Sequence, residues 1–378
     1  MAASPWLLIA RDFIQTGGMD AANLYLAMHL AERTSVVIVA HRTDENLIGP
    51  NVTIHTVRRP FGRDILGEGK LRSIGLLKAR ECIAKGGHVL ANGGNCLVPA
   101  ANWVHYVHAA YQSPAAGTIL RRWKDYFYHR RALRWEREAL TAAKVVIANS
   151  RLTAKQLVEH FGIDARKIHV VYYGTDPVRF GPIAPGEREV MRKQLGWDDR
   201  PWLIFIGGLG DRRKGFDVLY AAWRTLCAQP DWDANLAVIG RGAELAHWQS
   251  CAKADGVADR ISFLGFRNDV PNVLAAADAI VHPSRYEAYG LGVHEAMCRG
   301  LPAIVSANAG VAERFPENLR ELLLAHLDDP EALVERLKHW RKNQAALQVR
   351  ATAYSSKLRV RTWSHMAEEI RTIVEGMA

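Results

Sequence analysis

The sequence predicts an α/β protein built from two doubly wound domains, each a parallel sheet with helices on its faces. Its 378 residues correspond to two domains, because a single domain usually contains roughly 100–200 residues. Short apolar runs alternate with longer helical patterns, as they do in parallel β-α-β units. This alternation lapses once, over residues 173–199, where glycine and proline are frequent, and then starts again.

The first series of elements occupies the N-terminal half of the chain. Its apolar runs are expected to form strands at Trp6–Ala10, Val36–Ala40, Val52–Val57, Val89–Ala91, Trp103–Val107, Val145–Ala148 and His169–Tyr172. Helices are expected between several of them, at Asp20–Glu32, Lys70–Ala84, Leu120–Leu140 and Leu152–His160. The interruption at Tyr173–Asp199 is the expected linker.

The second series follows this linker. Its strands are expected at Trp202–Ile206, Leu236–Ile239, Ile261–Leu264, Ala279–His282 and Ala303–Ser306. Its helices are expected near Gly215–Cys227, Glu244–Ala254, Gly292–Arg299, Glu331–Lys342 and Arg361–Val374. The predicted domains are residues 1–178 and residues 179–357, with the C-terminal helix of residues 358–378 crossing back to the first domain.

The net charge of +10 favours negatively charged partners. Residues 1–180 contain 24 Lys and Arg against 14 Asp and Glu, whereas the remainder contains 25 of each, so the first half carries the whole excess. Such a half suits an anionic acceptor, a membrane surface or nucleic acid, and the alternative is an ordinary solvated surface. With 49% hydrophobic and 23% charged residues, the chain is not a disordered one.

Five scattered cysteines without a C-x-x-C pair indicate a reducing compartment rather than a disulfide framework or a zinc ribbon. No apolar run approaches the ~18 residues of a spanning helix, and no basic signal-peptide start is present. We therefore expect a cytoplasmic protein, at most peripheral to a membrane. Metal-hydrolase and serine-hydrolase motifs are missing, and Asp231-Trp-Asp233 precedes a predicted strand, so it is expected to be a polar loop and not a metal site.

The segment His282–Glu295 is the strongest functional signal, because ligands bind at the carboxyl ends of strands in doubly wound sheets. A strand ends, a loop carries Glu287, and a helix begins near Gly290 with backbone N–H groups that suit an anion. Glu295, about a turn inside this helix, is a good acceptor for paired sugar hydroxyls. The donor-binding candidates here are Tyr289, Gly290, Leu291, Gly292 and Glu295. The alternative is a surface loop with a glutamate favoured by the helix dipole.

A glycine-rich turn with three cations, Ile206–Gly215, follows the first strand of the second domain. Glycines such as Gly208 let the backbone approach a ligand. Arg212, Arg213 and Lys214 are the donors that a leaving diphosphate needs as its charge develops. The turn is neither a Walker loop nor a dinucleotide Gly-x-Gly-x-x-Gly, and its alternative is a solvated basic turn.

Weaker candidates follow other strands. In the first domain they are the pair Gly17 and Gly18 before a helix, and His108 at the end of an alternating strand. His105, two residues earlier, is expected to be a packed core histidine. In the second domain they are Gly240, Phe266 and Arg267, of which the last two form a turn that suits a nucleotide base. Each of these has a purely structural alternative as a turn or core residue.

Together these residues resemble the retaining glycosyltransferases of family 4, which have the GT-B fold. The resemblance covers nearly the whole chain. It is carried by the Gly-Gly turn, Ala148-Asn-Ser150, Tyr173-Gly-Thr-Asp176, the Glu-x7-Glu pair Glu287 and Glu295, the Lys-Gly turn and Gly300-Leu-Pro302. Two departures are Gly207-Gly-Leu209, where many members have Gly-Arg-Leu, and Ala309-Gly-Val-Ala-Glu313, where Gly-Gly-x-Pro-Glu is usual.

The resemblance implies a metal-independent enzyme without a cofactor. It would move a hexose-type sugar from a UDP- or GDP-sugar to a carbohydrate or lipid-linked acceptor. The implied catalytic residues are Lys214, Arg213, Glu287 and His108. Lys214 and an adjacent arginine would stabilise the diphosphate, and Glu287 would contact the donor sugar. Glu295 would bind the ribose, and Gly17 and Gly18 would lie against the phosphates.

Two other interpretations stay open at this point. One is a nucleotide-sugar hydrolase or epimerase with the same two-domain plan. The other is a binding protein that uses its basic half on nucleic acid or on a membrane, which leaves the second domain's motifs unexplained. The stretch Arg121–Trp135 interleaves aromatic and basic residues and suits an anionic membrane surface, with an ordinary amphipathic helix as the alternative.

Overall fold

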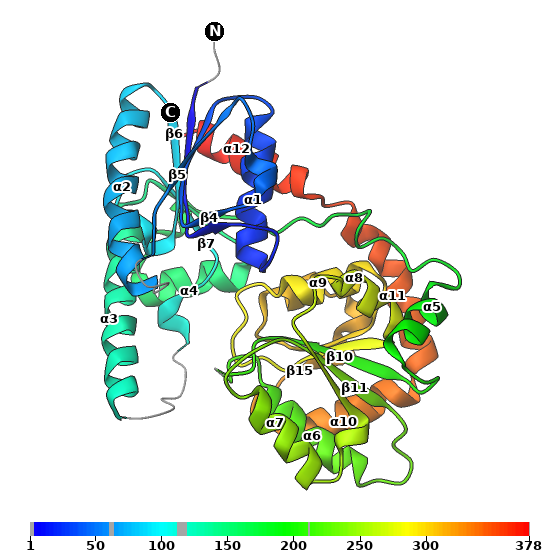
Figure 1. Cartoon of the computed structure of the whole chain (residues 1–378). Helices are drawn as coiled ribbons and strands as arrows, with labels where there is room; N and C mark the ends of the chain where they lie inside the picture. The colour runs from blue at the N-terminus through cyan, green and yellow to red at the C-terminus, as the bar shows by residue number, and fades with distance from the viewer. Residues whose placement is uncertain (1–3, 60–63, 112–118, 211, 378) are drawn as a thin grey trace. The chain divides into compact units, whose positions relative to one another are not determined.

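A computed structural model describes residues 4–59, 64–111, 119–210 and 212–377. The chain divides into two compact units (Figure 1): unit 1 comprises Met1–Gly174 and Arg361–Ala378, and unit 2 comprises Thr175–Val360. The unit boundary after Gly174 lies four residues before the predicted one, and the chain returns to unit 1 at Arg361. Each unit is built around a parallel sheet, so the predicted α/β class with two doubly wound domains is confirmed.

Unit 1 contains a seven-stranded parallel sheet with the order β5-β3-β1-β6-β7-β8-β9. The strands are β1 (Trp6–Ile9), β3 (Val36–Ala40), β5 (Val52–Thr56), β6 (His88–Asn92), β7 (Ala101–Val104), β8 (Val145–Ala148) and β9 (Ile168–Val170). β1 lies inside the sheet between β3 and β6 and is buried throughout, which explains why its sequence is continuously apolar. A small separate ladder joins β2 (Asp12–Phe13) to β4 (Arg42–Thr43).

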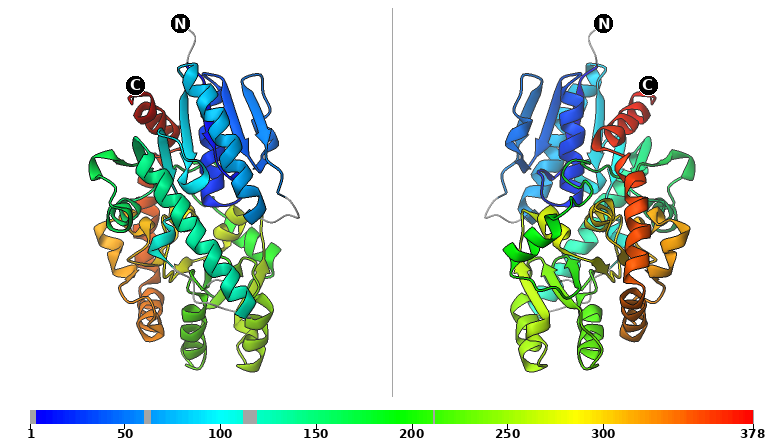
Figure 2. Two further views of the ribbon diagram at one scale, coloured as in Figure 1. Left: turned by 90° about the vertical axis from the view of Figure 1, so that its left-hand side faces the viewer. Right: turned by 90° about the vertical axis from the view of Figure 1, so that its right-hand side faces the viewer.

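Helices cover both faces of this sheet. They are α1 (Gly18–Ala31), α2 (Asp64–Ala84), α3 (Ile119–Ala142), α4 (Arg151–Phe161) and α12 (Trp363–Glu375). Figures 1 and 2 show α2 on one side and α1 with α12 on the other. α4 has strong local signals at both ends, because Ser150 accepts a hydrogen bond from the Thr153 amide at 3.0 Å and Gly162 ends the helix with φ of 67°.

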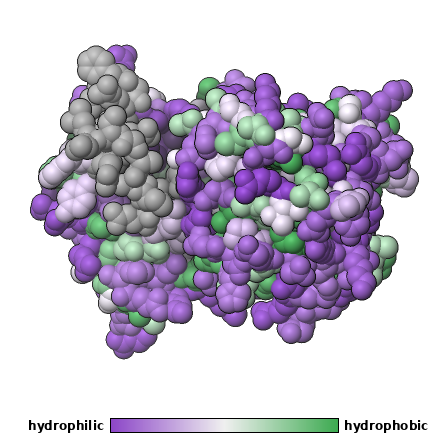
Figure 3. Space-filling model, turned by 90° about the horizontal axis from the view of Figure 1, so that it is seen from below, coloured by the Kyte–Doolittle hydropathy of each residue, from purple (hydrophilic) through white to green (hydrophobic). Residues whose placement is uncertain are grey.

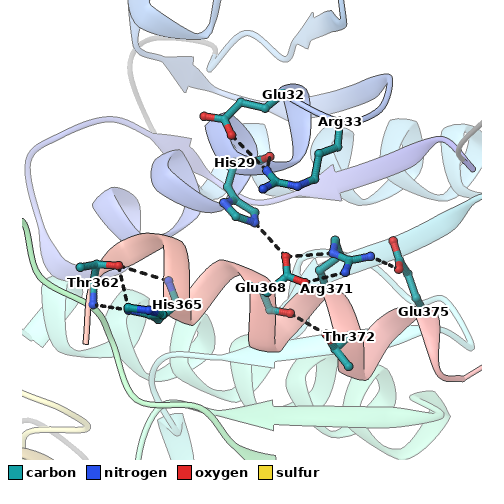
Figure 4. A network of polar contacts seen from close by, with 9 residues as sticks. All are labelled: His29, Glu32, Arg33, Thr362, His365, Glu368, Arg371, Thr372 and Glu375. Atoms are coloured by element: carbon teal, nitrogen blue, oxygen red, sulfur yellow. Dashed lines mark hydrogen bonds and ion pairs between the residues drawn. The ribbon is translucent and has the colours of Figure 1, made fainter. Parts of the chain in front are cut away.

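The C-terminal helix α12 packs on α1 through a polar network (Figure 4). His29 of α1 lies 3.2 Å from the Glu368 carboxylate, which also accepts two hydrogen bonds from Arg371. Thr362 and His365 form a capping box at the start of α12. The aromatic rings of Tyr25 and Trp363 stack nearby, with centroids 4.9 Å apart.

The two segments that join the units touch each other inside unit 1. Gly174 lies against the backbone of Thr362 so closely that a Cβ at residue 174 would stand 2.3 Å from the Thr362 carbonyl carbon. Arg361 donates a hydrogen bond to the Tyr172 carbonyl at 2.9 Å. The outgoing and the returning chain are therefore fastened together at this point.

Unit 2 contains a six-stranded parallel sheet with the order β12-β11-β10-β13-β14-β15. The strands are β10 (Trp202–Ile206), β11 (Asn235–Ile239), β12 (Ile261–Gly265), β13 (Ala279–His282), β14 (Ala303–Ser306) and β15 (Leu323–Leu324). The helices are α5 (Glu187–Leu195), α6 (Phe216–Cys227), α7 (Leu245–Ala254), α8 (Val270–Ala276), α9 (Leu291–Cys298), α10 (Pro330–Lys342) and α11 (Gln344–Arg359). One continuous apolar core fills the unit.

Three expectations about elements were wrong. The interval Tyr173–Asp199 is not a simple linker, because it contains α5, whose two ends are marked by glycines with left-handed backbones. No helix was expected at α8 or α11. The strand expected at Trp103–Val107 is β7 and ends at Val104, because its pairing with β6 and β8 covers only Ala101–Val104. His108 therefore begins a short 3-10 turn after the strand.

The surface in Figure 3 is mainly hydrophilic, with small separate hydrophobic areas. Among the described parts of the chain, no helix combines the length and the apolar character that crossing a bilayer requires.

Candidate active site

The basic turn after β10 is held in a strained shape. Arg212 has a left-handed backbone with φ of 52°, and Gly215 has φ of 71°. The Arg285 side chain donates to the Arg212 carbonyl at 2.6 Å, and its own amide donates to the Arg213 carbonyl at 2.9 Å. Asp217 fixes Arg285 through two hydrogen bonds of 2.8 Å. The loop after β13 thus braces the turn that carries Lys214.

Lys214, Glu287 and His282 form a row at the carboxyl ends of β10 and β13, in which Glu287 and His282 are buried and Lys214 is partly exposed. The Lys214 ammonium group forms a short ion pair with the Glu287 carboxylate. His282 Nε2 lies 3.1 Å from the same carboxylate oxygen. Burial alone would raise the pKa of Glu287, but Lys214 and the His282 hydrogen bond hold it well below its usual range. Glu287 is therefore ionised, and the row provides a fixed charge pair.

The two arginines of the turn have different surroundings. Arg213 donates to the Tyr286 carbonyl at 3.2 Å and is close enough to Glu287 to lower its pKa. Arg212 is half-exposed and lies 3.5 Å from Glu244 instead. Arg213 is therefore the arginine that the structure brings together with Lys214 and Glu287.

The loop after β13 leads into α9 through a bridge to its neighbour. Glu287 pairs with Ala309, and the Glu287 carbonyl accepts a hydrogen bond from the Gly310 amide at 2.9 Å. Gly290 precedes α9 with φ of 101°, a conformation that favours glycine. The amides of Leu291 and Gly292 have no acceptor among the described residues. These partly exposed amides give the N-terminus of α9 the features of an anion site.

Glu295 lies in α9, and its carboxylate has no hydrogen-bond partner among the residues that the structure describes. Burial raises the pKa of Glu295 to about 8, and the nearby Arg179 opposes this only in part. The Tyr289 side chain is buried, and its hydroxyl lies 3.2 Å from His294 Nδ1. Of these two candidates, Glu295 is partly exposed and Tyr289 is buried.

The turn that was expected to suit a nucleotide base, Phe266 and Arg267, follows β12, and Gly240 follows the neighbouring strand β11. Phe266 is exposed over 45% of its surface, and the Arg241 guanidinium lies over its ring at 4.7 Å from the centroid. Arg267 is paired with Asp269 at 2.7 and 2.5 Å. Gly240 follows β11 where a Cβ would stand 1.8 Å from the Gly207 carbonyl oxygen, so two glycine turns lie against each other. Gly208 is exposed beside them.

In unit 1, Gly17 caps α1 with φ of 95° and Gly18 is the first residue of the helix, which follows the carboxyl end of β1. Asp20 in the first turn has one buried carboxylate oxygen without a partner among the described residues. Burial, followed by the nearby Asp12, raises the pKa of Asp20 to about 7. Asp20 was not singled out from the sequence, because a first-turn aspartate is common in helices.

The two histidines after β7 have different environments. His105 is buried, its Nδ1 lies 2.5 Å from the Tyr173 hydroxyl, and burial lowers its pKa to about 3. His108 is partly exposed, and its ring lies against the buried carboxylate of Glu136. The expected core role of His105 and the accessible position of His108 both agree with this arrangement.

Several residues at these sites have weak or no signals in the sequence. His282 was seen only as the end of a strand, although a polar residue in that place is a usable signal. Arg285 and Arg241 have no signal of this kind, because a single arginine outside a motif does not indicate a site. Glu136 lies 28 residues from His108 in the chain, and no spacing rule connects them. Asp233, the last residue of the polar Asp231-Trp-Asp233 loop, accepts two hydrogen bonds from Arg341.

Two family models match this chain. The model described as Glycosyltransferase Family 4 matches residues 16–179, and the model described as Glycosyl transferases group 1 matches residues 187–358. Between them they cover both units except the short flanking segments. The two family models and the fold together define a glycosyltransferase with the GT-B fold. The chain belongs to glycosyltransferase family 4.

Curated relatives carry out several sugar transfers. Mannosylfructose-phosphate synthase of Agrobacterium fabrum is 25% identical over 61% of this chain and 53% of its own length. D-inositol 3-phosphate glycosyltransferase of Stackebrandtia nassauensis is 25% identical over 94% of this chain and 85% of its own. The lipopolysaccharide core mannosyltransferase LpsB of Rhizobium meliloti is 33% identical over 54% and 58%. The aligned part thus spans little more than half of two of these relatives.

Solved structures share the fold over nearly the full chain. WaaG, a glycosyltransferase involved in lipopolysaccharide biosynthesis, has a TM-score of 0.75 at 19% identity and covers 98% of this chain and 100% of its own. Sucrose-phosphate synthase from Thermosynechococcus elongatus has a TM-score of 0.76 at 21% identity, covering 99% of each chain. Anabaena HepE, solved with UDP and glucose, has a TM-score of 0.74 at 20% identity and covers 98% and 99%.

Proposed function

We propose that this glycosyltransferase moves a hexose-type sugar from a UDP- or GDP-sugar to an acceptor hydroxyl, with retention of the anomeric configuration. The product would belong to polysaccharide, lipopolysaccharide or glycolipid assembly. The single observation that carries the proposal is the row of Lys214, Glu287 and His282 beside the first-turn amides of α9, which have no acceptor among the described residues. Cations and helix amides at one sheet edge suit a diphosphate that leaves with increasing negative charge.

In the proposed reaction, the bond between the sugar C1 and the diphosphate oxygen breaks while the acceptor oxygen bonds to C1 on the same face. The acceptor's hydroxyl proton passes to the departing diphosphate. Lys214 and Arg213 stabilise the charge on that diphosphate, and the amides of Leu291 and Gly292 add their dipoles. These groups supply charge stabilisation that a metal ion supplies in other enzymes, so we propose a transferase without a metal or another cofactor.

The rest of the donor has proposed partners in unit 2. Glu295 would accept hydrogen bonds from the ribose hydroxyls, because its carboxylate lacks a partner in the described structure. Glu287 would contact the transferred sugar. The exposed Phe266 ring under Arg241 would lie beside the base. The complex of Anabaena HepE with UDP supports a nucleotide site in a protein of this fold.

The acceptor is proposed to bind unit 1, with His108 near the transferred sugar and the turn of Gly17 and Gly18 beside the phosphates. The basic excess of the first half supports an anionic acceptor rather than nucleic acid. Names of relatives that contain mannosylfructose-phosphate and inositol 3-phosphate point to the same chemistry.

A lipid-linked acceptor on an anionic membrane is the finer proposal for this unit. Trp123, Tyr126 and Phe127 of α3 are exposed and contact one another through their rings. Arg130 lies over the Tyr126 ring at 5.7 Å. Exposed aromatic rings beside cations are typical of a surface that rests on lipid headgroups.

A thermal-shift panel of nucleoside diphosphates and their sugars tests the donor class. A bound ligand raises the melting temperature by mass action, so UDP or GDP should raise it and the Lys214→Ala variant should respond less. Absence of a shift with every nucleotide would count against the proposal. Turnover measured with and without an acceptor then separates transfer from hydrolysis or epimerisation, since the latter two release a product without any acceptor.

A further inference from the structure

We propose that Glu136 is a positioning residue which fixes the orientation and the tautomer of His108. The inference deepens the proposed function, because it rests on the contact between His108 and the transferred sugar. It starts from one juxtaposition: a fully buried carboxylate of α3 lies against both the backbone and the ring of a histidine that follows β7.

The geometry ties His108 to Glu136 at two points. The His108 backbone amide donates a hydrogen bond to Glu136 Oε2 at 3.1 Å. The ring Nδ1 of His108 lies 3.3 Å from the same oxygen. This Nδ1 is buried and has no partner with good hydrogen-bond geometry among the described residues. Glu136 Oε2 is the acceptor that lies beside this nitrogen.

The contact with His108 also explains why the Glu136 carboxylate is buried. The residue is 1% exposed, and removing a carboxylate from water is costly unless donors compensate for the lost hydration. Within the described residues, no Lys or Arg forms an ion pair with it. Glu138, two residues further along α3, is instead partly exposed and bonds to Arg72 and Arg134. Ion pairing at the surface therefore accounts for the position of the Glu138 carboxylate, but it does not account for the burial of the Glu136 carboxylate.

The arrangement decides which ring nitrogen of His108 serves a ligand. A neutral imidazole has one N–H donor and one acceptor nitrogen. In this neutral form, a proton on Nδ1 is favoured by the carboxylate beside that nitrogen, and Nε2 then keeps its lone pair. The His108 side chain is 42% exposed while its Nδ1 is buried, which leaves the Nε2 edge as the accessible part. His108 then accepts a hydrogen bond from a sugar hydroxyl instead of donating one.

A double-mutant cycle tests the functional part of this inference. Glu136→Leu should lower kcat/KM about tenfold, the value of one hydrogen bond of roughly 1.4 kcal/mol. Glu136→Gln, which retains an acceptor oxygen for Nδ1–H, should recover part of this loss. Glu138→Gln is the matched control and should leave kcat/KM unchanged. The double variant Glu136→Leu/His108→Ala should be no slower than His108→Ala alone; fully additive losses would overturn the proposal.

A spectroscopic measurement tests the tautomer without any activity assay. In protein labelled with ¹⁵N-histidine, the His108 resonances, assigned by their loss in His108→Asn, should show that the neutral ring carries its proton on Nδ1 and none on Nε2. The proton should move toward Nε2 in Glu136→Leu. A neutral His108 ring that carries its proton on Nε2 in the unmodified protein would overturn the inference. Full activity of His108→Ala would instead refute the sugar contact in the proposed function and leave the tautomer result standing.

Discussion

Gly215 lies directly against Pro283: a Cβ at residue 215 would stand 1.9 Å from the Pro283 carbonyl oxygen. The two residues come from different strand ends, one before α6 and the other in the loop after β13. Their contact brings the turn with Lys214 beside the loop with Glu287. A backbone contact of this kind positions the charged pair more firmly than the two flexible side chains could by themselves.

A Gly215→Ala substitution should destabilise unit 2 by about 3 kcal/mol, because it combines a left-handed backbone with a steric clash. Gly256→Ala is the matched control. Gly256 has φ of 69° but open space around its Cα, so only the backbone penalty of about 1 kcal/mol should appear. Denaturant unfolding followed by circular dichroism measures both variants. Equal losses of unfolding free energy in the two variants would show that the contact with Pro283 does not exclude a larger side chain at residue 215.

Replacing Lys214 should reduce activity far more than a surface lysine does. Lys214→Ala removes a cation that the developing diphosphate charge requires, and kcat should fall by about 100-fold or more. Lys253→Ala, an exposed lysine of α7, serves as the control. Steady-state kinetics with a nucleotide-sugar donor gives the comparison, and unchanged kcat in Lys214→Ala would contradict the role.

A second variant separates activity that is lost because the protein unfolds from activity that is lost because the catalytic cation is missing. Lys214→Ala leaves the ionised Glu287 buried, which should cost about 3 kcal/mol of stability. The double variant Lys214→Met/Glu287→Gln removes both charges, so its melting temperature should return toward that of the unmodified protein. Its activity should stay low. Recovery of activity together with stability would mean that the ion pair only supports the fold.

The raised pKa of Glu295 should make stability depend on pH. In the native protein this carboxyl keeps its proton up to about pH 8, whereas in the unfolded chain it ionises near its usual pKa of 4.5. Between these values the unfolded state binds fewer protons, so the free energy of unfolding should fall as pH rises from about 5 to 8. Urea unfolding at several pH values should show a smaller decline in Glu295→Gln. Identical pH profiles of the unmodified protein and Glu295→Gln would show that Glu295 is not the group responsible for the decline.

The affinity for a nucleotide should increase with pH, because Glu295 would bind the ribose in its ionised form. Ribose hydroxyls donate to the ionised carboxylate, so the affinity for the nucleoside diphosphate should rise between pH 7 and 9, by at most about tenfold per unit. Calorimetric titrations of the unmodified protein and of Glu295→Gln provide the test. The rise should be lost in the variant, and a rise of the same size would exclude Glu295 from the ribose site.

Membrane contact of unit 1 should depend on the aromatic residues of α3. Trp123→Ser/Phe127→Ser should reduce cosedimentation with anionic lipid vesicles severalfold, since it removes the exposed rings but keeps the charge. Leu77→Ser/Ile83→Ser changes two other exposed apolar residues of the same unit and is the control. Neutral vesicles should bind weakly in every case. Equal binding by both double variants would remove α3 from the proposal.

Most strands were predictable because buried parallel strands have continuous apolar sequences with abrupt ends. Val36–Ala40, Trp202–Ile206 and Ala303–Ser306 were placed correctly to the residue. β15 has only two residues and is defined by its pairing with β14, a contact that no local pattern reveals. α5 was hidden because the prolines and glycines around it indicate a loop.

Lys214 and Glu287 could be selected as candidates from the sequence because they lie in the segments that follow β10 and β13. Their pairing depends on β10 and β13 being neighbours in the sheet, which only the topology reveals. The choice between Arg212 and Arg213 depends on backbone direction within the turn, and residue type does not encode it. Glu136 illustrates the largest gap, since its meaning arises from a helix packed on a distant loop.

The contact of Gly174 with Thr362 has a consequence for synthesis on the ribosome. Unit 1 is discontinuous in sequence, and α12 leaves the ribosome only after the whole of unit 2. Although N-terminal domains commonly fold first during synthesis, here the first unit has to wait with the α1 face uncovered until the second has emerged. A nascent chain stalled before residue 361 should thus be a better substrate for chaperones than the complete protein.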